Sequence, residues 1–131
     1  MAARHTVYSL DEANALVPRV RAILLQLAVE QHRLDVAHAE MHRQLDASTD
    51  PGADPAAARR EAEMTEAREG IRGLLGLLEA DGILLRDPEM GLVDFPAERD
   101  GKPVWLCWRL SDPRVAHWHG TDEGYTSRRP W

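Results

Sequence analysis

The chain has 131 residues, of which 44% are hydrophobic and 29% are charged. This length and composition are typical of one globular domain and exclude a multidomain enzyme. The formal net charge of −6 argues against a protein that binds nucleic acid by neutralising phosphates. No segment approaches the ~20 apolar residues that span a bilayer, and the N-terminus has no apolar leader, so we expect a soluble cytoplasmic protein without a membrane or nucleic-acid partner.

A long helix is predicted over residues 10–47. Ser9 and Glu12 can form a capping box, in which each side chain accepts a hydrogen bond from the backbone N–H of the other residue. Beyond it, mostly apolar positions recur at alternating steps of three and four, which is typical of a coiled-coil seam. Pro18 removes one backbone donor near the start and predicts a kink rather than an end. The seam consists of Leu10, Ala13, Val17, Val20, Leu24, Leu27, Gln31, Leu34, His38, Met41 and Leu45.

A second helix is predicted over residues 57–81, after a loop at residues 48–56. The loop concentrates turn-forming residues and contains two prolines, so the chain is expected to reverse direction there. The second helix repeats the spacing of the first, and Gly82 is suited to a left-handed C-cap. Its seam consists of Met64, Ala67, Ile71, Leu74 and Leu78.

The remaining third differs in composition, because all four tryptophans lie after residue 104. Short apolar runs separated by turn signals predict a small antiparallel sheet over residues 82–119. The tail, residues 120–131, has no periodicity. It contains the large aromatic residue Tyr125, which is uncommon in disordered tails, so we expect the tail to be ordered, with the Tyr125 ring buried against the tryptophans. The chain is therefore expected to form one α+β domain over residues 1–131. This domain would contain a long antiparallel two-helix hairpin, a small antiparallel sheet and an ordered irregular tail.

The register of the last predicted hairpin decides which side chains share a face of the sheet. A four-residue turn at residues 111–114 would pair Cys107 with Trp118, which places Cys107 on the face opposite His117 and His119. A shift of one residue would reverse this result. Cys107 is the only cysteine, so it forms no internal disulfide. We interpret it as a small buried side chain, with a reactive thiol as the alternative.

Four side chains near the end of the sheet are candidate ligands of a divalent transition metal. His117 and His119 alternate on one strand and therefore share a face, and Asp122 and Glu123 follow closely. Their spacing matches no closed zinc motif, and a solvated cluster is the alternative interpretation. No other cofactor is expected.

Several segments together form a specific pattern. These are Tyr8-Ser-Leu-Asp-Glu-Ala-Asn-Ala-Leu-Val-Pro18, Gly91-Leu-Val-Asp-Phe-Pro96, Leu106-Cys-Trp-Arg109, Trp118-His119 and Asp122-Glu-Gly-Tyr125 with Arg128. In these segments, and over nearly its whole length, the chain resembles a family of small bacterial proteins named domain of unknown function 2203. The resemblance implies a helical hairpin followed by a compact C-terminal module, and it implies no reaction. It directs attention to Asp94, Arg109, His119, Gly124 and Arg128.

Two of these residues interrupt apolar strands. Asp94 and Arg109 would each be costly if buried without a partner. We therefore expect Asp94, Arg109, His119 and Arg128 to form one polar network, in which a carboxylate of the tail accepts a hydrogen bond from His119 or Arg109. Such a network is either purely structural or a pocket for a small anion or a metal.

Two classes of function follow from these patterns. Apolar positions beside the helical seams favour a non-enzymatic interaction or assembly module, which forms a homodimer through its helices or binds an unknown protein partner. The alternative is a metal or small-ligand binding protein with its site around His119, and a catalytic thiol at Cys107 is a third hypothesis. The apolar positions beside the seams are Leu16, Ile23, Leu25, Leu75 and Leu77.

Overall fold

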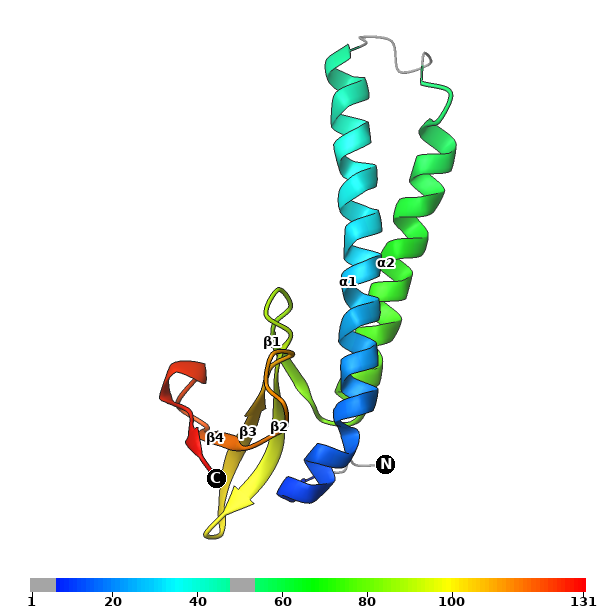
Figure 1. Ribbon diagram of the computed structural model, residues 1–131. Coiled ribbons are helices and arrows are strands. Elements are labelled where there is room, and N and C mark those ends of the chain that lie inside the picture. The colour runs from blue at the N-terminus through cyan, green and yellow to red at the C-terminus, as the bar shows by residue number, and fades with distance from the viewer. Residues whose placement is uncertain (1–6, 48–53) are drawn as a thin grey trace. The chain divides into compact units, whose positions relative to one another are not determined.

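The computed structural model describes residues 7–47 and 54–131 and confirms the predicted α+β fold (Figure 1). Two helices precede a five-stranded antiparallel sheet of order β1-β2-β3-β4-β5. The elements are α1 (Leu10–Ala47), α2 (Ala57–Ala80), β1 (Leu84–Asp87), β2 (Leu92–Arg99), β3 (Lys102–Trp108), β4 (His117–Gly120), the 3-10 turn η2 (Tyr125–Ser127) and β5 (Arg129–Pro130). Residues 48–53 of the predicted loop lie outside the described residues. No helix in the described part of the chain is long and apolar enough to cross a membrane.

The chain divides into two compact units, one formed by Met1–Leu24 with Leu75–Trp131 and the other by Leu25–Leu74. In the second unit, α1 and α2 run side by side, and Arg33 Nη2 on α1 lies 3.3 Å from Glu66 Oε2 on α2. The interpretation of the whole chain as one domain stays a prediction.

The start of α1 has the predicted capping box. The backbone N–H of Ser9 donates to Glu12 Oε1 at 2.9 Å, and the backbone N–H of Glu12 donates to Ser9 Oγ at 3.1 Å. Pro18 lies inside the helix, which continues to Ala47. Figure 1 shows the first turns of α1 set at an angle to the turns that follow, as expected for a proline that bends a helix without ending it.

The end of α2 is a Schellman motif built on Gly82. This glycine has a φ of +72°, its N–H donates to the carbonyl of Glu79, and the N–H of Ile83 donates to the carbonyl of Leu78. Asp81 belongs to this closing turn because its N–H donates to Leu78, three residues back, so α2 ends at Ala80, one residue before the predicted end.

One face of the sheet is apolar and packs against the N-terminal segment of the same unit. The Tyr8 ring meets Phe95 edge-on with 5.8 Å between centroids, and the Arg21 guanidinium lies 5.5 Å from the centre of the Trp108 ring. Because side chains alternate along each strand, the residues between these apolar ones face the other way. The buried apolar face consists of Val93, Phe95, Ala97, Val104, Leu106 and Trp108.

The predicted pairing of Cys107 with Trp118 is wrong by one residue. Cys107 instead lies opposite His117, and Trp105 lies opposite His119. Cys107 therefore shares a face with both histidines, which corrects the expectation that they point to opposite sides.

The connection between β3 and β4 occupies residues 109–116. The register shifts because the last opposed pair, Cys107 and His117, encloses nine residues, an odd number, whereas the predicted hairpin enclosed an even number. Val115 is not part of the hairpin, because its N–H donates to Asn14 Oδ1 at 2.8 Å and its carbonyl accepts from Asn14 Nδ2 at 3.0 Å. Asp112 stabilises the turn itself by accepting from the backbone N–H of Arg109 at 3.1 Å. Val115 is thus bound to the Asn14 side chain of α1 and lies outside β4, to which the sequence pattern assigns it.

The tail adds a strand that the sequence pattern does not reveal. After η2 the chain returns, and β5 pairs with β4 through Pro130 opposite His117 and Arg129 opposite Trp118. The tail is therefore ordered, as predicted, but its end belongs to the sheet.

Candidate metal centre

The polar face of the sheet brings Asp94, Cys107 and His119 together from β2, β3 and β4. One donor atom of each side chain, a carboxylate oxygen, the thiol sulfur and an imidazole nitrogen, lies within 4.8 Å of the other two. All three residues are at most 2% exposed. Ligand atoms around a tetrahedral zinc ion are roughly 3.5 Å apart, given bond lengths near 2.0 to 2.3 Å. To hold one metal ion, the cluster would therefore need the His119–Asp94 pair, now 3.0 Å apart, to open slightly and the Cys107 sulfur to lie at a similar spacing.

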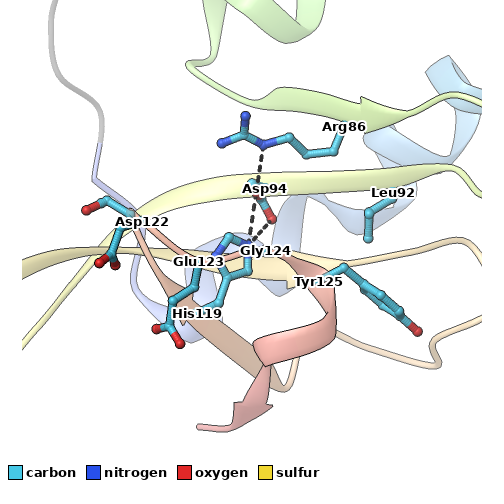
Figure 2. Close-up of a pocket in the computed structure, with 9 residues that line it drawn as sticks. Arg86, Leu92, Asp94, His119, Asp122, Glu123, Gly124 and Tyr125 are labelled. Atoms are coloured by element: carbon cyan, nitrogen blue, oxygen red, sulfur yellow. Dashed lines mark hydrogen bonds and ion pairs between the residues drawn. The ribbon is translucent and has the colours of Figure 1, made fainter.

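The hydrogen bonds of His119 fix the protonation of its ring. Nδ1 lies 2.9 Å from the carbonyl oxygen of Gly120, and a carbonyl only accepts, so Nδ1 carries a proton. In the neutral ring Nε2 is then unprotonated and presents a lone pair. It lies 3.0 and 3.1 Å from the two carboxylate oxygens of Asp94 (Figure 2). A cation must lie between these groups, either a shared proton or a metal ion. A backbone carbonyl behind Nδ1 is the usual support of a metal-binding histidine.

Asp94 has a second partner, Arg86, that the sequence analysis does not identify. Arg86 Nε donates to Asp94 Oδ2 at 2.9 Å, and its guanidinium lies 5.2 Å from the centre of the Trp105 ring. Arg86 stands at a bulge in β1, where the pairing register shifts between Leu85 and Asp87. No spacing rule predicts the direction of a side chain at a bulge, so its contact with Asp94 has no signal in the sequence.

Cys107 is a free cysteine, and its thiol is buried. Burial, together with the Asp94 carboxylate, raises the pKa of Cys107 to about 11, against the opposing effect of the Arg128 guanidinium. A reactive thiol needs a lowered pKa. The interpretation of Cys107 as a catalytic nucleophile is therefore disfavoured, whereas a bound metal cation would itself remove the thiol proton.

A pocket of about 370 Å³ opens beside the cluster. Asp94 and His119 line it together with residues of the tail (Figure 2). The residues that line it are Arg86, Leu92, Asp94, His119, Thr121, Asp122, Glu123, Gly124 and Tyr125.

Asp122 and Glu123 line this pocket, but Figure 2 shows both carboxylates directed away from Asp94. Glu123 Oε1 accepts from the backbone N–H of Gly120 at 2.9 Å and from Arg129 Nη2 at 3.1 Å. The Gly120 hydrogen bond, and then the charge of Arg129, lower the pKa of Glu123. The expected hydrogen bond from His119 to a tail carboxylate is replaced by the one to Asp94.

Arg109 and Arg128 belong to a different group of side chains, so the predicted network of four residues divides in two. Arg128 binds the Asp112 carboxylate with both terminal nitrogens, at 2.7 and 3.2 Å, and Arg109 Nε lies 3.8 Å from Asp112 Oδ1. Both guanidinium carbons lie close to the Tyr125 ring, 5.3 and 4.5 Å from its centroid. Tyr125 is thus half-buried against arginines, not buried against tryptophans as predicted. Asp112 lies in the predicted turn at residues 111–114, and its carboxylate anchors this second group.

The fold and the site together define an α+β protein whose sheet carries a buried Asp-Cys-His cluster on the face opposite its apolar core. The chain belongs to the family of uncharacterized conserved proteins DUF2203, whose model matches residues 6–131. This confirms the family resemblance. Comparison with curated proteins and with solved structures gives no match.

Proposed function

We propose that this protein binds a divalent transition metal of the zinc class through the Asp94 carboxylate, the Cys107 thiolate and His119 Nε2. The observation that supports the proposal is the close approach of three different donor groups, all buried, on adjacent strands. A thiolate and an imidazole select zinc-like ions, whereas magnesium and calcium prefer oxygen ligands alone. The Nδ1 hydrogen bond of His119 leaves Nε2 as the coordinating atom.

The competing interpretation is a metal-free ion pair between Asp94 and a protonated His119, held by Arg86. Such a pair would satisfy the buried carboxylate, and Cys107 would contribute only packing. The thiol therefore separates the two interpretations: a metal site needs its sulfur, and an ion pair does not.

The experiment measures zinc binding by protein purified without an affinity tag and stripped of metal. One Zn²⁺ per chain should bind, and Co²⁺ should give the near-ultraviolet charge-transfer band of a cobalt thiolate. Cys107→Ala should lose that band and most of the affinity. His32→Ala, which removes an exposed imidazole from α1, is the matched control and should bind as the parent does. Equal zinc affinity of the parent and Cys107→Ala, or no binding by the parent, would contradict the proposal.

A second candidate function is self-association through the helical hairpin. Leu25, Val29 and Val36 are 53%, 51% and 42% exposed, and their spacing places them in one stripe along α1. An apolar stripe on a helix favours association with a like surface, so we propose a homodimer formed through this face. Light scattering over a series of concentrations tests it. The parent should dimerise, Val29→Glu should be monomeric, and a parent that stays monomeric would contradict the idea.

A further inference from the structure

His117 lies in the same row of the sheet as two of the proposed metal ligands. It lies directly opposite Cys107, which itself lies directly opposite Asp94, so the three residues form one row across β4, β3 and β2. Directly opposed residues on neighbouring strands have Cβ atoms roughly 4.5 to 5.5 Å apart and share a face. His119 follows two positions later on β4 and shares that face as well. A metal ion above Cys107 thus has one histidine beside it and another diagonally placed.

His117 also carries a polar atom without a partner. Its Nδ1 is buried from solvent and has no hydrogen-bond partner among the described residues. An unpaired buried polar group is destabilising, and most such atoms in native proteins are paired with protein, water or an ion. His119, by contrast, has contacts at both ring nitrogens. His117 therefore adds to this face a buried nitrogen that no other described side chain or backbone group contacts.

We infer that His117 Nδ1, which lies outside the cluster of donor atoms that are within 4.8 Å of one another, moves in when the metal binds, becomes the fourth protein ligand and closes the metal site. This inference rests on the proposed metal-binding function. The donor set becomes two imidazoles, one thiolate and one carboxylate, which is a complete tetrahedral shell for zinc. Catalytic zinc sites keep one position open for water or substrate, whereas structural sites are filled by protein. The ion is thus structural: it ties together β2, β3 and β4.

The test determines the number and identity of the ligands. X-ray absorption of the zinc-loaded parent should count two imidazoles and one sulfur. Co²⁺ bound to the parent should show the intense visible bands of a four-coordinate ion. His117→Ala should weaken Co²⁺ binding by at least about 10- to 100-fold, since even loss of an outer-shell partner has an effect of that size. His32→Ala is again the control.

The outcomes separate this inference from the proposed function. One imidazole in the absorption spectrum, or parental affinity and an unchanged visible spectrum in His117→Ala, would overturn the role of His117 while metal binding stands. No binding of Co²⁺ or Zn²⁺ by the parent would overturn both. The imidazole count uses the parent alone, so it decides the question even if the variant fails to fold. His117→Asn, whose folding is checked by circular dichroism, provides a second variant.

Discussion

His119 Nε2 on β4 lies 3.0 Å from Asp94 Oδ1 on β2, although β3 runs between these strands. The contact is diagonal, because Asp94 lies opposite Cys107 whereas His119 lies opposite Trp105. The two side chains thus meet above β3, on the face of the sheet that carries the Cys107 thiol. A contact that crosses a strand in this way links β2 to β4 over β3 through side chains alone, with or without an ion between them.

Asp94→Asn is expected to destabilise the metal-free protein by about 1.5 to 3 kcal/mol, because a neutral amide replaces the charged partner of buried His119. Arg86 can turn to solvent, since its side chain is 45% exposed. The loss therefore falls on buried His119. Urea unfolding of the metal-free proteins measures the change, and Asp122→Asn, at an exposed carboxylate of the same pocket, is the control. A stability equal to that of the parent would show that the contact contributes nothing.

Arg86→Ala is expected to lower zinc affinity by about 10- to 100-fold, the usual effect of removing a side chain that orients a metal ligand. Arg86 holds Asp94 through its Nε atom. Arg86→Lys should recover only part of the affinity, because an ammonium group lacks the guanidinium geometry. Competition titration against a zinc chelator measures both variants. Arg72→Ala, which removes an exposed arginine from α2, controls for the change in charge, and an unaltered affinity in Arg86→Ala would rule out the positioning role.

Local signals predicted the helices well, because the interactions that define their ends are close in sequence. The Ser9–Glu12 box and the Gly82 cap each involve residues within a few positions of one another. The face shared by His117 and His119 was predictable for the same reason, since alternation on one strand settles it.

The composition of the candidate site was less predictable, because distant contacts assemble it. Val115 lies outside β4 and is bound by Asn14, 101 residues earlier in the chain. The local pattern assigns Val115 to the strand and does not determine the register, so it turns Cys107 to the wrong face. Arg86 stands at a bulge, where alternation carries no information.

Asn14→Ala is expected to destabilise the protein by about 2 to 4 kcal/mol, because two buried backbone groups of Val115 lose their partners at once. Asn14→Asp keeps the acceptor for the N–H of Val115 but not the donor for its carbonyl, so its loss should be smaller. Thermal and urea unfolding compare the variants. If the alanine and aspartate variants were equally stable, the amide of Asn14 would not be what holds the 109–116 connection.

Acid should weaken the second group of side chains, in which the Asp112 carboxylate binds Arg109 and Arg128. Burial raises the pKa of Asp112, but hydrogen bonds from Arg128 and from the backbone N–H of Arg109 outweigh it and leave that pKa below its ordinary value of 3.8. The stabilisation by this carboxylate is therefore present above the ordinary value and is lost as the pH falls through the lower pKa of the folded state. The free energy of unfolding should fall less steeply below about pH 4 in Asp112→Asn than in the parent. Parallel pH profiles would contradict this assignment.

Zinc should raise the thermal stability of the parent protein. A ligand that binds only the folded state adds about 2.7 kcal/mol to the free energy of unfolding at a free concentration 100 times its dissociation constant. Three of the proposed ligands come from different strands, so the ion opposes separation of β2, β3 and β4. Calorimetry in a zinc titration should show a melting temperature that climbs with free zinc in the parent and in His32→Ala. In Cys107→Ala the curve should stay nearly flat. An equal rise in Cys107→Ala would place the stabilising ion elsewhere in the protein, and no rise in the parent would leave the Asp94–His119 contact as a metal-free ion pair.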